Sequence, residues 1–434
     1  MSGADGLVKI PELRKRILFT LMILAVYRIG VHIPTPDVDG AALQHVFSNM
    51  KGTIFGWFNL FSGGALERFS IFALGVMPYI SSSIIFQLLT VIWPYLHDLQ
   101  KEGEQGRKKI TQYTRYGTVL LCLVQGYGIA TGLEHYSNPA VVLHPGLAFR
   151  LFTTCTLTAG TVFLMWLGEQ ISERGITNGI SLIIYAGIAA RIPQGIGGTL
   201  SLYRSGELSF FKILLVLAVI VATFFCIIFV ERGARRIPIQ YAKRIVGRKV
   251  YGGQNSHLPL KVNTSGVIPP IFASSLIMFP ATVASFFPSE RVQKMTALLQ
   301  PGTLLYNVLF VALIVFFCFF YTAVTFKTED VSDNLKKYGG FIPGIRPGAP
   351  TAQYIDYVLS RITLGGAVYI SAICVLPTFF TQTMKVPFYF GGTSVLILVG
   401  VALDTVAQIE TFLLTRNYDG FMKHTRLKGR AAYT

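Results

Sequence analysis

The sequence has little charge for its length. Asp, Glu, Lys and Arg make up 14% of its 434 residues, and 52% are hydrophobic, including 33 Phe. Soluble domains normally have about a quarter of their residues charged. Too little charge remains here to cover soluble surfaces, so a disordered chain and an ordinary soluble enzyme are both excluded. The apolar excess needs lipid as its solvent, which predicts an all-helical, polytopic membrane protein.

Residue clusters that carry catalytic or metal chemistry are also lacking. The five cysteines each lie in an apolar run and form no CxxC pair, and the seven histidines are scattered without ligand spacing. We therefore expect buried thiols, no disulfide framework, no metal and no cofactor. No nucleophile and base are suitably spaced, so we expect no enzyme activity. No GxxxxGK[ST] motif occurs, so energy for any active process must come from partners.

Long apolar runs are abundant, and runs of about 20 residues predict spanning helices. Ten occur, at residues 17–34, 74–94, 117–133, 151–167, 180–196, 211–230, 267–287, 304–326, 362–380 and 395–414. An even number places both termini on one side. Most of the 38 Lys and Arg residues then fall in segments on the same side as the termini. The positive-inside rule predicts that both termini are cytoplasmic.

The segment of residues 55–72, FGWFNLFSGGALERFSIF, does not fit a simple span. It is broken by Gly63-Gly64, carries Glu67 and Arg68, and leads into a span that Gly75 and Pro78 are expected to interrupt. It is too short and too polar to cross the hydrocarbon core alone. Irregular backbone at membrane depth persists only where protein or a watery cavity surrounds it. We prefer a re-entrant segment to the alternative, an amphipathic helix on the outer surface.

Two short repeats divide the spans into two halves. Residues 75–83 and 266–274 share GVxPxIxxS, and residues 179–184 and 392–397 share GxSxxI. They pair span 2 with span 7 and span 5 with span 10, as two five-helix halves at residues 17–200 and 205–414 require. Five is odd, so the halves are inverted. Inverted repeats with interrupted helices predict a transport path between them. A secondary transporter with a polar substrate site would also explain this pattern.

Aliphatic residues occupy equivalent places in these repeats. They are Val76, Ile80, Ile180, Ile184, Ile271 and Ile397. An aliphatic constriction excludes water and ions by dewetting, yet gives way to a larger apolar solute. Ordinary packing is the alternative for any single one of them. Charges inside spans are few, and Arg28 and Arg191 lie near predicted outer ends, where we interpret them as snorkelling side chains.

Two cytoplasmic loops are strongly basic. The loop 231–262, expected to form a long hairpin, has one acid and eight bases, which are Arg232, Arg235, Arg236, Lys243, Arg244, Arg248, Lys249 and Lys261. This density suits RNA phosphates or an acidic protein, and contact with anionic lipid is the alternative. In the loop 327–361, a Gly- and Pro-rich stretch at residues 339–348 is expected to form a stiff turn that presents Arg346 outward.

Several longer motifs follow the order and spacing of a known family. They are FNLFSGGALERFSIFALGVMPYISSSII, GRKKITQYTRYGT, MWLGEQISERGITNGIS, YAKRIVGR, HLPLKVN, GVIPPIFASS, DNLKKYGGFIPGIRPG and KVPFYFGGTS. Over nearly the whole chain, the sequence resembles the SecY family, the channel subunits of the Sec translocon. The resemblance implies ten helices in two inverted halves that form a clamshell, with a re-entrant plug. The implied function is to pass unfolded preproteins across the cytoplasmic membrane and to release apolar segments into lipid.

The resemblance also assigns roles to residues and names partners. The pore ring falls on the six aliphatic residues above, and the plug on Phe61, Ser62, Gly63, Gly64, Ala65, Leu66, Glu67 and Arg68. The lateral gate falls between helices 2–3 and 7–8, at Ser81, Gln125 and Phe279. Docking of the ribosome, through rRNA phosphates, and of the motor ATPase SecA falls on Arg235, Arg236, Lys243, Arg244, Arg248, Lys249 and Arg346. SecE and SecG are the implied heterotrimer partners, SecDF and YidC are further candidates, and preproteins with signal sequences are the clients.

Overall fold

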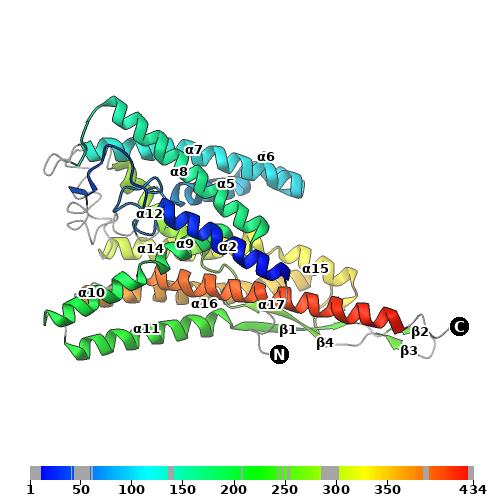
Figure 1. Ribbon diagram of the computed structural model, residues 1–434. Coiled ribbons are helices and arrows are strands. Elements are labelled where there is room, and N and C mark those ends of the chain that lie inside the picture. The colour runs from blue at the N-terminus through cyan, green and yellow to red at the C-terminus, as the bar shows by residue number, and fades with distance from the viewer. Residues whose placement is uncertain are drawn as a thin grey trace. The chain divides into compact units, whose positions relative to one another are not determined.

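Helices dominate the computed structural model, which describes residues 11–40, 42–43, 59, 62–134, 141–206, 209–241, 244–246, 249–251, 255–284, 303–384 and 391–428. Each of the ten predicted spans contains a helix (Figure 1). Among the described residues, 7 helices are long and apolar enough to cross a membrane. The number rises to 8 if the bent pair Met77–Ile92 and Pro94–Lys101 is counted as one span. The prediction of an all-helical polytopic membrane protein is confirmed.

Two further predicted spans are helical but have shorter apolar stretches. Helix α2 (Pro11–Gly30) carries Arg14, Lys15 and Arg16 at its beginning and Arg28 near its end, which shortens its apolar part. Helix α12 (Ile268–Ala284) has a shorter apolar stretch, at Ile268–Ile277. Both helices lie where the sequence predicts spans 1 and 7.

The chain divides into two units. The first consists of Met1–Gly197, Met278–Pro301 and Val401–Thr434, and the second of Gly198–Ile277 and Gly302–Gly400. One boundary lies within α10 (Ile192–Arg204), between the helices of predicted spans 5 and 6.

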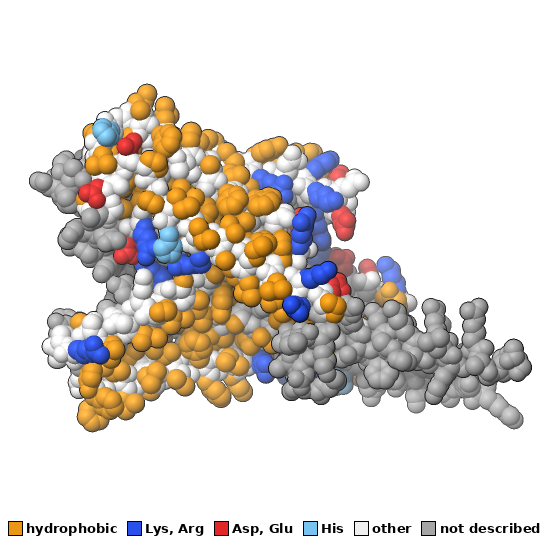
Figure 2. Space-filling view, viewed as in Figure 1, with side chains coloured by type: hydrophobic (Ala, Val, Ile, Leu, Met, Phe, Trp, Pro, Cys, Tyr) orange, Lys and Arg blue, Asp and Glu red, His pale blue; other side chains and the backbone are white. Residues whose placement is uncertain are grey.

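The first unit is built on a pair of long helices, α7 (Glu104–Glu134) and α8 (Leu147–Arg174), which pack along each other (Figure 1). Helix α5 (Met77–Ile92) packs on α7, and both α2 and α9 (Gly179–Ala189) pack on α8. An ion pair between Arg115 of α7 and Glu169 of α8, with an N–O distance of 2.8 Å, joins the long helices. Apolar side chains dominate their exposed face in Figure 2, as expected of a surface that contacts lipid.

The expectation that Gly75 and Pro78 interrupt the second span is wrong. Helix α5 begins at Met77, so Gly75 precedes it and Pro78 lies in its first turn. Proline is well tolerated there, because the first N–H groups of a helix have no intrahelical acceptor. The helix is instead broken at its other end. Trp93 has extended backbone, and α6 (Pro94–Lys101) leaves at a bend of 96°.

The second unit is centred on α16 (Ala349–Met384), which packs against α11 (Phe210–Glu231), α14 (Leu304–Thr325) and α15 (Thr328–Lys337). Helix α16 begins well before residue 362, where its predicted span starts, so its first turns belong to the second basic loop. Helix α17 (Gly392–Lys428) begins in this unit and continues into the first.

A small sheet joins the two basic loops. Strand β1 (Ala234–Tyr241) pairs antiparallel with β4 (Asn255–Lys261), from Ala234↔Lys261 to Gln240↔Asn255, which confirms the predicted hairpin. Strands β2 (Arg244–Val246) and β3 (Lys249–Tyr251) form a second pair within it. Strand β5 (Gly340–Phe341), from the other loop, pairs with the free edge of β1. A core of Ile237, Leu260, Ile342 and Ile355 lies beneath the strands, so the two loops form one folded body.

Candidate functional site

Residues 62–76 form a run of turns inside the first unit, and we call them the re-entrant segment. Leu66, Phe69, Phe72 and Leu74 are each 3% exposed or less. A surface-bound amphipathic helix would leave one face exposed and would be helical, so that alternative is excluded for these residues. The segment has the irregular, protein-surrounded backbone that the sequence predicts.

Two helices of the first unit clamp the end of this segment. The ring of Phe72 stacks on Tyr27 of α2 and on Phe163 of α8, with centroid distances of 6.2 and 6.1 Å. The helices carry glycine at the contact. A Cβ at Gly30 would clash with the Phe72 ring, and a Cβ at Gly160 would clash with the carbonyl oxygen before Phe72. The segment therefore fits only because α2 and α8 lack side chains there.

Backbone hydrogen bonds tie the same stretch to the chain that follows α2. The amide of Thr35 donates to the Phe69 carbonyl at 2.9 Å, and the amide of Ile71 donates to the Ile33 carbonyl at 3.1 Å. The Thr35 hydroxyl also donates to the Phe69 carbonyl. These bonds hold Phe69 in a left-handed conformation, with φ of 43°, which non-glycine residues adopt rarely.

An ion pair holds the middle of the segment. Arg191, just after α9, donates from Nη2 to Oε2 of Glu67 at 2.7 Å. Asn59 adds two bonds: its Nδ2 donates to the same carboxylate oxygen at 3.1 Å, and its Oδ1 accepts the Glu67 amide at 3.1 Å. The Glu67 and Arg191 side chains are 35% and 13% exposed, so both charges are partly desolvated. Charge-assisted bonds in such a setting are stronger than bonds between exposed groups.

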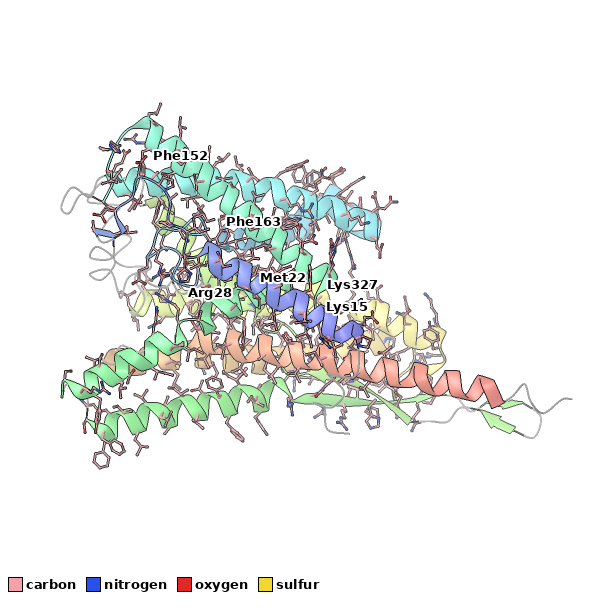
Figure 3. The ribbon with its side chains drawn as sticks, in the orientation of Figure 1. Lys15, Met22, Arg28, Phe152, Phe163 and Lys327 are labelled. Carbon is pink, nitrogen blue, oxygen red and sulfur yellow. The ribbon has the colours of Figure 1, made fainter. Side chains whose placement is uncertain are left out.

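The beginning of the segment, at Ser62 and Gly63, lies against α2 and α9. Arg28 donates from Nη1 to the Gly63 carbonyl at 3.3 Å, and the Tyr27 hydroxyl donates to the Ser62 carbonyl at 3.3 Å. Gly63, with φ of 67°, lies so close to Gly187 that a Cβ on it would be 2.8 Å from the Gly187 Cα. Figure 3 shows Arg28 near the end of α2 that leads to this region.

Snorkelling therefore does not account for Arg28 and Arg191. Both guanidinium groups bind the re-entrant segment, one through a backbone carbonyl and one through Glu67. Sequence reasoning missed this role. A signal was available, because Glu67 and Arg191 carry opposite charges and both lie near the predicted outer side, where an intramembrane charge calls for a partner.

The six predicted ring residues all lie at or near the first two turns of helices. They are Val76 and Ile80 at α5, Ile180 and Ile184 in α9, Ile271 in α12 and Ile397 in α17. All are buried except Ile180, which is partly exposed. The Ile180 side chain lies against Gly168 of α8, where a Cβ would approach it to 2.8 Å. The first four belong to the first unit and the last two to the second.

The predicted gate residues are described in part. Ser81 of α5 is half-buried, and Gln125 of α7 is 5% exposed. Within the described part of the chain, the Oε1 atom of Gln125 is buried without a hydrogen-bond partner. Phe279 belongs to α12, but its side chain lies outside the described residues. Phe61, assigned to the plug, also lies outside them.

The described docking residues lie on strands β1, β2 and β3 and in the turn after β5. Arg235 and Arg236 are exposed on β1. Lys243 and Arg248 lie outside the described residues, as do the side chains of Arg244 and Lys249. The paired strands hold both basic loops in a common framework.

The turn that carries Arg346 is fixed on both sides. The amide of Ile345 donates to the Ile342 carbonyl at 3.0 Å, and the Thr351 hydroxyl donates to the Arg346 carbonyl at 2.9 Å. Ile342 is buried in the core beneath the sheet, whereas the Arg346 side chain is exposed. Gly344 has φ of 81°, which a tight turn of this kind accepts from glycine without strain. The structure thus confirms a stiff turn that presents Arg346 outward.

Comparisons with known proteins agree with this geometry. A family model described as SecY matches residues 70–406. The protein translocase subunit SecY of Escherichia coli (strain K12) is 54% identical over 423 residues, which covers 96% of each chain. The protein translocase subunit SecY of Vibrio cholerae is 51% identical over 435 residues, which covers 99% of this chain and 97% of that one.

Solved structures show the same fold. One described as the structure of a protein conducting channel gives a TM-score of 0.65 at 17% identity and covers 97% of this chain and 95% of that one. Sec61 in the canine ribosome–channel complex from the endoplasmic reticulum gives 0.61 at 16% identity, with the same coverage. These likenesses show the fold, and the family model and the bacterial relatives show the family. The chain belongs to the SecY family.

Proposed function

We propose that this protein is the central protein-conducting channel of the Sec translocon in the cytoplasmic membrane. It passes unfolded preproteins across the membrane and releases apolar segments sideways into lipid. The observation that carries the proposal is the re-entrant segment, which is buried among helices yet has no regular structure. Side chains of α2 and Arg191, just after α9, bind its Ser62, Gly63 and Glu67. Such a segment can leave its place without unfolding a helix.

Residues 61–68 act as the plug of the resting channel, and the six aliphatic residues form the constriction. Support comes from their positions. Ile80, Ile184, Ile271 and Ile397 are buried near the beginnings of four different helices. Apolar walls of this kind exclude water and ions by dewetting. The seal is therefore aliphatic, and the plug adds to it.

Apolar segments leave the channel through a gate formed by helices 2–3 and 7–8, with Ser81, Gln125 and Phe279 on its sides. The Oε1 of Gln125, which is buried and has no hydrogen-bond partner in the described part of the chain, supports a polar contact at this place. The driving force for exit is the burial of apolar surface in lipid, at about 25 cal/mol for each Å².

The joined basic loops dock the partners that supply energy. They present Arg235 and Arg236 on β1 and Arg346 on a rigid turn. The ribosome docks through rRNA phosphates, SecA docks at the same body, and SecE and SecG complete the heterotrimer. SecDF and YidC are further candidate partners. Both termini are cytoplasmic, which places these loops on the side where ribosomes and SecA are present.

The seal tests this proposal directly. Replacing both Ile80 and Ile271 with Ser should raise the ion conductance of planar bilayers that contain the purified complex, because the widened, polar constriction would stay wetted. A matched control replaces Ile84 and Ile277, which are also buried and lie further along α5 and α12. The channel of the control variant should stay closed, with a conductance like that of the unmodified protein. Equal conductance of both variants would assign the two ring isoleucines to packing.

A further inference from the structure

We infer that Glu231 and Asn263 are positioning residues that couple the docking hairpin, β1 to β4, to helix α12 of the constriction. Glu231 is the one acid in the basic loop 231–262, and the docking function assigned to the eight bases leaves it unexplained. Asn263 follows this loop, shortly before α12 begins. The inference deepens the proposed channel function and rests on it, because a partner that docks on the basic loops has to move the residues that close the channel.

Both legs of the docking hairpin meet at these two residues. Helix α11 ends at Glu231 and leads into β1, as Figure 1 shows, and β4 leads on to α12. The pairing of β1 with β4 is continued by a bond from the Val262 amide to the Gly233 carbonyl at 2.9 Å. The side chains then close the base of the hairpin, because Nδ2 of Asn263 donates to Oε1 of Glu231 at 2.6 Å. All these residues belong to the second unit.

The Asn263 side chain also holds residues 262–267, which we call the connection between β4 and α12. The side chain is 4% exposed. Its Nδ2 donates a second bond to the Gly266 carbonyl at 3.0 Å, and its Oδ1 accepts from the Ser265 hydroxyl at 3.1 Å. Both N–H donors of the amide are thus used. One side chain therefore links the end of α11 to the turn from which α12 begins.

Close packing keeps the connection from acting as a slack linker. A Cβ at Gly366 of α16 would lie 2.8 Å from the Val262 carbonyl oxygen, and a Cβ at Gly400 of α17 would clash with the Val267 side chain. The connection therefore lies directly on two helices that lack side chains there. Ile271 follows in the first turn of α12 and is buried. A displacement of the hairpin base is carried to Ile271 through contiguous packed contacts.

The bond between the two legs differs from the other bonds of the connection. It has a carboxylate acceptor, and charge-assisted hydrogen bonds are shorter and about twice as strong as neutral ones. At 2.6 Å it is shorter than the bonds of Asn263 to the connection itself. The Thr264 hydroxyl, in contrast, donates to the Lys261 carbonyl at 3.1 Å, which joins two residues of the same leg. Thr264 therefore offers a matched control.

The test separates docking from the movement that follows it. The chain with SecE and SecG is reconstituted in vesicles, and the dissociation constant of SecA is measured beside the maximum rate of SecA-driven preprotein translocation. Asn263→Asp places a second carboxylate against Glu231, and the two repel each other. We expect the maximum rate to fall about tenfold and the dissociation constant to change less than twofold, as the loss of one hydrogen bond to a charged group at the junction would produce. A role in folding alone would lower binding and rate together.

Rescue and control variants place the effect at this bond. Glu231→Gln added to Asn263→Asp restores the net charge and offers an amide donor to the introduced carboxylate, so it should recover most of the rate. Asn263→Ala removes the three bonds without repulsion and should also slow translocation more than it weakens SecA binding. Thr264→Val removes a bond within one leg and should match the unmodified protein.

A second measurement does not depend on translocation. Spin labels at His257→Cys of β4 and Leu276→Cys of α12, both exposed positions, report the distance between the hairpin and α12 after the exposed native cysteines are replaced by alanine. The distance distribution should be narrow in the otherwise unmodified protein. Asn263→Asp should broaden it, and the addition of Glu231→Gln should narrow it again.

Four outcomes would overturn the inference. They are an unchanged translocation rate in Asn263→Asp, an equal loss of SecA affinity and rate, no recovery when Glu231→Gln is added, and a distance distribution that Asn263→Asp leaves narrow. Failure of the unmodified protein to translocate any preprotein would instead contradict the proposed function. The distance measurement would still test the coupling in that case.

Discussion

Neutralising Glu67 should loosen the plug and make the resting channel leak. The substitution Glu67→Gln keeps the shape of the side chain and removes its charge. It removes the carboxylate that Arg191 contacts at 2.7 Å, at a site where the Arg191 side chain is 13% exposed. The amide of Glu67 still donates to Asn59, so the local backbone is retained. The interactions that change are the ion pair with Arg191 and the charge on the oxygen that accepts from Asn59 Nδ2.

The size of the effect follows from the geometry. Hydrogen bonds to charged groups contribute about 1.5–3 kcal/mol when buried. The Glu67 side chain is 35% exposed, so solvent screening lowers this value. We expect a loss of ~1–2 kcal/mol in the stability of the seated plug, which increases the unseated fraction about 5- to 30-fold.

The assay is the single-channel open probability in planar bilayers, measured without clients or motor. Glu67→Gln should raise it by about one order of magnitude, in line with the free-energy change above. Arg68→Gln is the matched control, because Arg68 is the next residue, is exposed, and has no hydrogen bond or ion pair among the described residues. The double variant Glu67→Gln with Arg191→Gln should leak no more than either single variant, since both remove one interaction.

Two results would refute this reasoning. Equal leakage from Glu67→Gln and Arg68→Gln would show that the ion pair does not hold the plug, because Arg68 takes no part in that pair. If the double variant leaks by the sum of the two single variants, the Glu67 and Arg191 side chains act independently. Their 2.7 Å contact would then not be what holds the plug.

Two other residues give further predictions. Gly160→Ala should lower the free energy of unfolding by about 1–3 kcal/mol, because its Cβ would clash with a backbone carbonyl of the re-entrant segment. Gly132→Ala in α7, where a Cβ meets nothing within 4 Å, should leave the free energy of unfolding unchanged. Similar shifts in melting temperature for the two variants would contradict the clash. Arg346→Lys should keep SecA binding but slow SecA-driven translocation into vesicles, since an ammonium lacks the planar donor fork. Arg346→Glu should abolish transport, and a wild-type rate would show that this turn is merely solvated.

Composition and run length were sufficient to predict the ten helices and the re-entrant segment. Apolar runs of spanning length leave few alternatives in a chain with so little charge. The break at Gly63-Gly64 and the charge at Glu67 are visible in the sequence and correctly exclude a simple span. The start of α5 was misplaced because Pro78 can either interrupt a helix or begin one, and only the backbone around Met77 distinguishes the two.

Patterns indicate at most a candidate pair among distant residues, such as the opposite charges of Glu67 and Arg191, and they do not establish the contact. Arg191 and Glu67 are 124 residues apart, and their meeting depends on how α9 packs against α8 and on the path of the re-entrant segment. The pairing of β1 with β5 was missed for a different reason. Strand β5 has 2 residues, too few for an alternating pattern to show. Its pairing depends on the core around Ile342, which forms only in the folded unit.

The most direct test of the channel function is reconstitution. The purified chain with SecE and SecG is placed in liposomes, and a preprotein with a signal sequence is added together with SecA and ATP. We expect the preprotein to become resistant to external protease only when ATP, SecA and this chain are all present. A preprotein that stays fully accessible to protease, in liposomes where the chain alone accumulates a small polar solute, would contradict the account and favour a secondary transporter.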